Sequence, residues 1–115
     1  MNEQQSEQSY KREPILERNF NNVKKEDQRI ALLATLLTAE KTASTLIISD
    51  GEKKVTCISP SDELFERIEV GKHYRFIGIP LFFEEGFELR LELVQEMNDV
   101  SKNLYTKTFN KLLWQ

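Results

Sequence analysis

The sequence predicts an all-β domain with accessory helices, and three features indicate this class. Two runs rich in β-branched residues, 44–49 and 53–59, flank an Asp50-Gly51 pair, which is a common turn of β-hairpins. Residues 87–94 alternate between apolar and charged side chains, as a strand with one buried face does. Residues 72–79 form a further strand-like run that opens after a glycine. Together these runs predict a small antiparallel structure.

The length of 115 residues suits one domain, but its apolar residues are unevenly distributed. Hydrophobic residues make up 39% of the chain, and residues 1–28 contain only six large apolar side chains. So little apolar surface cannot offset the entropy of ordering the backbone. We therefore expect residues 1–28 to form a disordered or partly ordered tail, and residues 29–97 to form the folded domain.

Composition excludes several classes of function. The chain has 16 basic and 19 acidic residues, a net charge of −3, so no basic excess indicates nucleic acid. The single cysteine, Cys57, cannot form an intrachain disulfide, and with the single histidine, His73, it cannot build a usual zinc site. We expect no metal and no cofactor.

The same reading argues against catalysis and against a membrane. The four glycines fall at turns or in strands, so there is no glycine-rich phosphate loop, and His73 has no acidic neighbour to orient it as a base. The N-terminus is polar and no apolar run approaches the length of a membrane span. We expect a non-enzymatic intracellular protein, cytoplasmic in a prokaryote or nuclear in a eukaryote, without a small-molecule substrate.

The first elements of the domain can be read in chain order. Residues 29–38 are apolar on both faces, which fits a central strand or a buried helix, and the hairpin that follows favours the strand. Ser59 and Pro60 resemble a helix start, and Gly71 resembles a helix end. We expect a helix of about two turns between them. Its apolar stripe would consist of Leu64, Phe65 and Ile68.

The later elements are two strands and a second helix. Residues 80–86 read as a loop between the strands 72–79 and 87–94. The alternation in 87–94 points Phe87, Leu89, Leu91 and Leu93 inward. Residues 98–115 carry apolar side chains at three- and four-residue spacings, which predicts an amphipathic α-helix.

This order of strands and helices resembles the OB-fold, a five-stranded Greek-key barrel. The matching segments are Leu46-Ile47-Ile48-Ser49-Asp50-Gly51, the run 71–78 with its glycine at each end, and the strand 86–94. The resemblance covers residues 29–94. With the C-terminal helix added, the chain resembles the small subunits of replication protein A, whose helix bundles with helices of partner subunits. The resemblance therefore implies a hetero-oligomer of OB-fold subunits that binds single-stranded DNA.

In this fold the ligand face is the outward side of the second and third strands and the flanking loops. Candidate nucleic-acid-binding residues are Lys41, Lys53, Lys54, Thr56, Arg75, Phe82 and Phe83. The outward residues of the second and third strands include no aromatic, and residues 29–94 hold 8 basic against 11 acidic residues. Both features disfavour tight direct binding. Phe82 and Phe83 could instead close one end of the barrel.

Outward apolar residues predict a covered surface. Ile47, Ile58, Ile77 and Ile79 have outward parity, so either the C-terminal helix or another chain should cover them. We expect the helix to contact a partner, its own barrel, or both. The candidate partner-binding residues are Val100, Leu104, Tyr105, Phe109, Leu112 and Leu113.

We expect a non-catalytic scaffold subunit of a single-stranded-DNA binding complex of the replication protein A type. It would reach DNA directly or through the complex. One alternative is a stand-alone OB-fold binder of single-stranded DNA or RNA. Another is an adaptor in a different assembly, such as a polymerase or a telomere-end complex.

Overall fold

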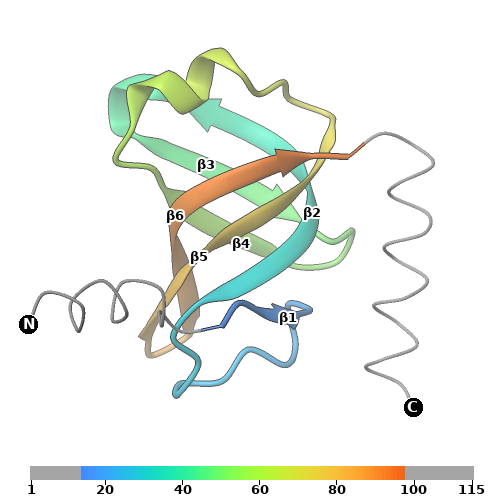
Figure 1. The fold of residues 1–115 in the computed structure, drawn as a ribbon, viewed down its shortest axis with the longest axis vertical. Helices are drawn as coiled ribbons and strands as arrows, with labels where there is room; N and C mark the ends of the chain where they lie inside the picture. The colour runs from blue at the N-terminus through green and yellow to red at the C-terminus, as the bar shows by residue number, and fades with distance from the viewer. Residues whose placement is uncertain (1–13, 98–115) are drawn as a thin grey trace, which may run out of the picture.

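A computed structural model describes residues 14–97 of the chain, and these residues form a small β-barrel (Figure 1). It contains six strands and two short 3₁₀-helices, η1 and η2. In chain order these are β1 (Leu16–Arg18), β2 (Ile30–Glu40), η1 (Lys41–Ala43), β3 (Thr45–Ser49), β4 (Lys54–Ile58), η2 (Asp62–Glu66), β5 (His73–Phe83) and β6 (Gly86–Glu96).

The strands β2 to β6 close into a barrel with the connectivity of the OB-fold. Their order is β2-β3-β4-β6-β5, and a further pairing of β2 with β5 completes the ring. Pairing is antiparallel throughout this ring except between β4 and β6, which are parallel. The predicted five-stranded barrel and its Asp50-Gly51 hairpin, with Gly51 at a φ of 104°, are thereby confirmed.

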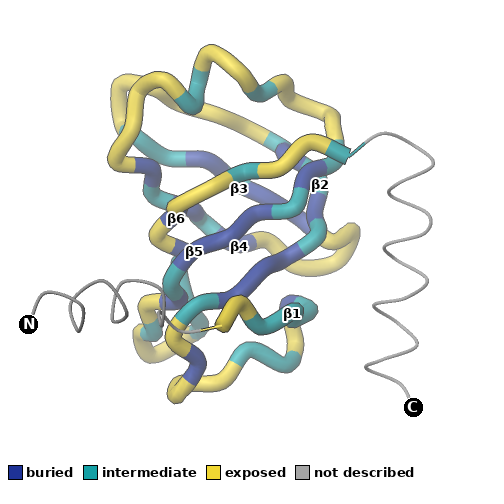
Figure 2. The backbone as a smooth tube through the Cα atoms, viewed as in Figure 1, coloured by how far each residue is buried: buried dark blue, intermediate teal, exposed yellow. Residues whose placement is uncertain are grey.

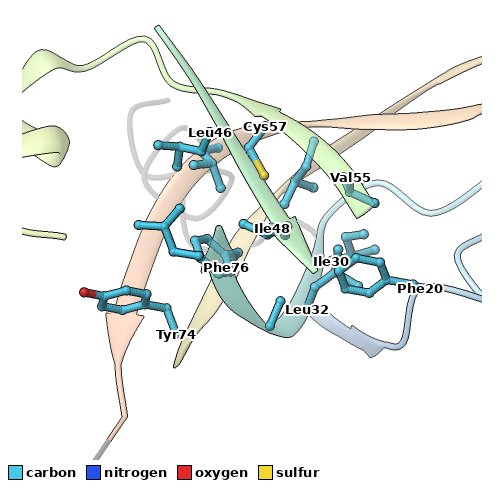
Figure 3. Close-up of a cluster of buried hydrophobic side chains, with 13 residues drawn as sticks. Phe20, Ile30, Leu32, Leu46, Ile48, Val55, Cys57, Tyr74 and Phe76 are labelled. Carbon is cyan, nitrogen blue, oxygen red and sulfur yellow. The ribbon is translucent and has the colours of Figure 1, made fainter. Parts of the chain in front are cut away.

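The core is formed by alternate residues of all five barrel strands (Figure 3). Residues such as Leu36, Ile48 and Phe76 are fully buried. Figure 2 shows buried stretches in the barrel strands, together with intermediate and exposed ones. Cys57 is also fully buried, and its burial raises the pKa of its thiol. This cysteine is therefore a core residue and not a reactive thiol.

A bulge in β6 depends on Gly78 of β5. The pairing runs from Ile77 opposite Leu93 to Gly78 opposite Leu91, so Glu92 is the extra residue. A Cβ atom added to Gly78 would lie 2.1 Å from the carbonyl oxygen of Arg90. Only glycine leaves room for the β6 backbone at this point.

The bulge corrects one predicted orientation. Leu89 and Leu91 point inward and Phe87 packs against the core, as the alternation predicts. The extra residue then reverses the parity, so that Val94 packs against the core and Leu93 is 46% exposed. The predicted inward orientation of Leu93 is wrong because strict alternation has no place for an inserted residue.

The predicted loop 80–86 is also wrong. β5 continues to Phe83 and β6 begins at Gly86, so only Glu84 and Glu85 connect the two strands. Pro80 suggested a loop because it lacks an amide donor. It lies beyond Gly78, the last residue of β5 that pairs with β2, so it removes no hydrogen bond from that ladder.

The predicted accessory α-helices are corrected as well. Between Ser59 and Gly71 the chain forms only the five-residue 3₁₀-helix η2, which has no side-chain cap. Leu64, Phe65 and Ile68 still pack against the core, so the apolar stripe has its expected contacts without an α-helix. The amphipathic helix over 98–115 lies outside the described residues. Within residues 14–97 no α-helix supports the predicted fold class of barrel plus helices.

Residues 14–28, which we expected to belong to a tail, pack on the barrel. β1 pairs in parallel with the start of β2, from Leu16 opposite Ile30 to Arg18 opposite Leu32. Phe20 is 6% exposed and belongs to the core cluster (Figure 3). A few apolar side chains suffice here because the barrel supplies the surface against which they are buried.

An ion pair closes the turn that follows β1. The guanidinium of Arg18 donates two hydrogen bonds to the carboxylate of Asp27, of 2.9 and 2.8 Å. The backbone amide of Lys24 donates a third, of 2.8 Å. The hydrogen bonds from Arg18 are the main cause that lowers the pKa of Asp27 below its ordinary value of 3.8. The Asp27 side chain is only 2% exposed, so its charge depends on these partners.

We predict that Gly78→Ala destabilises the barrel by about 3 kcal/mol, because the new methyl group overlaps the β6 backbone. Gly51→Ala is the comparison variant, since its added Cβ meets nothing and only its positive φ opposes it. It should cost about 1 kcal/mol. Urea denaturation of both variants measures the difference. Equal losses would contradict the requirement for space at Gly78.

We predict that Asp27 stabilises the fold at neutral pH and loses this effect in acid. Its pKa is lower in the folded than in the unfolded chain, so its contribution is present above the unfolded value and disappears as the pH falls through the folded value. Asp27→Asn should therefore cost about 1–3 kcal/mol at pH 7 and less at pH 2. Asp62→Asn, at an exposed residue, is the control. A pH-independent cost for Asp27→Asn would contradict the ion-pair account.

Candidate functional site

The outward face of β3 and β4 has the predicted parity. Leu46, Ile48, Val55 and Cys57 are buried in the core. The outward residues of the two strands are half-buried, apart from the exposed Lys54. These outward residues are Thr45, Ile47, Lys54, Thr56 and Ile58, of which Thr56 lies opposite Ile47. This face has no aromatic platform on which a base could stack.

The predicted lysines surround this face but bring little net charge. Lys53 and Lys54 are exposed at the β3–β4 turn, next to Asp50 and Glu52, so the turn is neutral overall. Lys41 lies in η1, in the loop from β2 to β3, and its Nζ is 3.2 Å from a carboxylate oxygen of Glu66. A phosphate backbone would meet two exposed lysines and no basic groove.

Arg75 does not belong to this group. It points outward from β5 and pairs with Gln95 of β6 in the strand register. Its guanidinium donates hydrogen bonds to the carboxylate of Glu17 in β1 and, at 2.6 Å, to the side-chain oxygen of Gln95. Arg75 therefore holds β1 against the barrel. It does not belong to the same group of cations as Lys53 and Lys54.

Phe82 and Phe83 occupy opposite sides of the β5–β6 hairpin. The ring of Phe82 contacts that of Phe87, with centroids 5.6 Å apart, as expected of a residue that closes the end of the barrel. Phe83 is 52% exposed and is free to contact a ligand. The acidic residues Glu84 and Glu85 follow it directly in the turn.

Arg90 was not among the predicted site residues, but the strand register places it centrally on the outer surface. Arg90 is exposed and lies opposite Ile58 of β4 on one side and Ile79 of β5 on the other. Alternation alone showed that it faces outward, but not which residues flank it. The parallel pairing of β4 with β6 provides its neighbours, and that pairing is a tertiary feature.

The described residues show no metal-binding cluster. Residues 14–97 contain no cluster of His, Cys, Asp and Glu side chains that could hold a metal ion. The Nδ1 atom of His73 lies 2.8 Å from the hydroxyl of Thr35, across the β2–β5 ladder. In the same residues no helix is both long and apolar enough to cross a bilayer.

The six candidate partner-binding residues, Val100 to Leu113, lie outside the described part of the chain.

Comparison with known proteins supports the OB-fold of this barrel. The chain matches no protein-family model and no curated protein. Among solved structures it is similar to a chain of the S. pombe Stn1–Ten1 complex, with 13% identity, 88% of this chain and 93% of that chain covered, and a TM-score of 0.64.

Two further structures give the same result. The telomere capping protein Ten1 of the same yeast has 16% identity, coverage of 86% and 97%, and a TM-score of 0.63. A replication protein A heterotrimer bound to single-stranded DNA has 13% identity, coverage of 73% and 69%, and a TM-score of 0.60. At these identities the similarities establish the OB-fold of the chain.

We predict that alanine substitutions separate the roles of Phe82 and Phe83. Phe82→Ala removes a ring contact at the barrel end and should lower the free energy of unfolding by about 2–3 kcal/mol. Phe83→Ala removes an exposed ring and should change it by less than about 0.5 kcal/mol. Thermal and urea denaturation measure both. If Phe83→Ala is as destabilising as Phe82→Ala, both rings are structural.

Proposed function

We propose that this chain is a non-catalytic OB-fold subunit of a complex that binds single-stranded DNA, in which it serves mainly as a scaffold. The observation that carries this proposal is the distribution of exposed side chains on the barrel. Three of the five exposed large hydrophobic residues in the described chain lie on β5 and β6, where Leu81, Phe83 and Leu93 are each at least 42% exposed. Such a surface is more typical of a protein interface than of a nucleic-acid groove.

The charge distribution supports a scaffold role. Residues 29–94 hold 8 basic and 11 acidic residues, so phosphate groups would be repelled by most of the barrel. Of the proposed basic contacts, Lys41 is paired with Glu66 and Arg75 with Glu17, which leaves Lys53 and Lys54. Two phosphate contacts supply little affinity at physiological salt.

The similar structures support the proposed assembly with other subunits. Two of their names describe assemblies, the Stn1–Ten1 complex and a replication protein A heterotrimer bound to single-stranded DNA. The third describes Ten1 as a telomere capping protein. We propose a comparable hetero-oligomer of OB-fold subunits, active in DNA replication and repair or at chromosome ends. Such a protein would be intracellular, and nuclear if the source is a eukaryote.

A stand-alone binder of single-stranded DNA or RNA is the second candidate, favoured by the exposed ring of Phe83. A 52% exposed aromatic at the β5–β6 turn could stack on a base, with Lys53 and Lys54 contacting phosphates. Two lysines and one ring would bind a single strand weakly. The stand-alone candidate nevertheless requires binding by the isolated chain, whereas the scaffold proposal does not.

We predict that the isolated chain binds a fluorescent 20-nucleotide oligothymidine with a Kd weaker than about 10 µM at 200 mM salt. Lys53→Glu with Lys54→Glu should abolish what binding remains at 50 mM salt. Titration by fluorescence anisotropy at both salt concentrations measures this. Submicromolar binding at 200 mM salt would contradict the scaffold role and favour the stand-alone binder.

Assembly is tested separately by purifying the tagged full chain from native extract. The proposal expects other OB-fold subunits in stoichiometric amounts, in a complex that is retained on single-stranded-DNA resin. Recovery of the chain alone, in a form that the resin does not retain, would overturn it.

A further inference from the structure

A groove lies beside the β6 bulge on the outer surface of the barrel, with Glu92 in its lining. This groove has a volume of about 870 Å³ and is lined by residues of β5, β6, the segment from β4 to η2, and the start of the described chain. Its apolar lining includes Ile15, Leu64, Ile77, Ile79, Leu93 and Val94. Two of these, Ile15 and Leu93, are more than 40% exposed although they are large hydrophobic residues. The groove is thus an apolar surface open to solvent.

One side of the groove is an unpaired strand edge. β4 pairs with β6 only at Cys57 and Ile58, opposite Leu89 and Arg90, and then turns away at Ser59. From Leu91 to Glu96 no strand of the described residues pairs with β6 on the side that β4 has left. Figure 1 shows this part of β6 crossing the front of the barrel, and Figure 2 shows that it is largely exposed. An unpaired edge offers backbone donors and acceptors to an added strand.

The charge of the groove is opposite to that of the barrel. Its charged residues are Arg29, Arg67, Arg90 and Glu92, a net charge of +2. Arg29 and Glu92 neutralise each other through two hydrogen bonds of 2.6 and 3.0 Å. Arg67 and Arg90 are exposed, and neither forms an ion pair with a described residue. The groove therefore offers two available cations on a domain with an acidic surface.

We propose that this groove is the docking site for an acidic peptide segment of a partner protein, which adds to the free edge of β6 as a further strand. Alternate apolar side chains of the peptide would fill the groove, and its carboxylates would pair with Arg67 and Arg90. The inference deepens the proposed function by naming the interface, and its test requires no DNA.

Other occupants fit these observations less well. No lining residue of the groove is aromatic, so single-stranded DNA would find no stacking surface there. Residues 98–115 of this chain carry three lysines and one aspartate, a net charge of +2, and would be repelled by the arginines. Residues 1–13 join the groove at Pro14, but Met1 and Tyr10 are their only large apolar residues.

The first test uses the full chain and a labelled nine-residue peptide in which glutamates alternate with leucines. We expect binding by fluorescence anisotropy, and none of a peptide in which lysines replace the glutamates. Arg67→Glu with Arg90→Glu should weaken binding of the glutamate peptide about tenfold or more, and should create binding of the lysine peptide. Both arginines are exposed, so the double variant should keep the thermal stability of the wild-type chain.

The matched control is Lys53→Glu with Lys54→Glu, which changes the net charge by the same amount at exposed residues that do not line the groove. It should leave peptide binding unchanged, although the proposed function expects it to abolish residual oligothymidine binding. Equal loss with both double variants would show attraction by overall charge and overturn the docking site. Because the two assays use different ligands and variants, failure of one proposal is distinguishable from failure of the other.

Strand addition has its own test. A proline at the centre of the glutamate peptide removes one backbone donor and should weaken binding about tenfold, although all charges remain. Amide hydrogen exchange of Glu92 to Glu96 should slow when the glutamate peptide binds.

Protection of this whole edge in the free full chain would show that the chain fills its own groove. Competition between oligothymidine and the peptide, with loss of both in the arginine variant, would assign the groove to nucleic acid. Either result would overturn the proposal.

Discussion

The close approach of the β6 backbone to Gly78 is the constraint on which the rest of the outer surface depends. The carbonyl of Arg90 occupies the space that a side chain at position 78 would need. β6 can therefore form its bulge at Glu92, which increases the coiling of the strand and helps to close the barrel. The same bulge turns Leu93 outward and Val94 inward. A single missing Cβ thus helps to determine which β6 side chains face the core and which face solvent.

Three arginines of the described chain are neutralised by neighbouring carboxylates, and this limits which cations remain available on the surface. Arg18 pairs with Asp27, Arg75 with Glu17, and Arg29 with Glu92. The first pair closes the turn after β1 and the second fastens β1 to the barrel, so those arginines have a structural use. Such partly buried pairs fix geometry more than they add stability. Among the described cations without an ion pair, Lys53 and Lys54 lie at the β3–β4 turn, and Arg67 and Arg90 line the groove beside the β6 edge. Lys24 and Lys25 lie apart from both, in the turn that follows β1.

Much of the barrel and part of the site can be predicted from the sequence, because these features depend on short-range patterns. The Asp50-Gly51 turn and the alternation in β3 and β4 specify which residues face the core, whatever lies beyond. Other features could not be predicted from the sequence. Phe82 and Phe83 are adjacent in sequence, but only the hairpin shows that one packs on Phe87 and the other is exposed. Arg75 was grouped with the lysines because its partner, Glu17, lies in a segment we expected to be a tail.

The sequence by itself determined the succession of the five barrel strands along the chain, the hairpin turn and the inward residues of the central strands, because these follow from hydrophobic period and local turn chemistry. Tertiary structure decided the rest. The 3₁₀-helix η2 replaced a predicted α-helix while its apolar residues kept their contacts with the core. Parallel pairing of β4 with β6 placed Arg90 between Ile58 and Ile79 and left the remaining β6 edge open. These features arise from contacts between residues far apart in the chain, which no local pattern encodes.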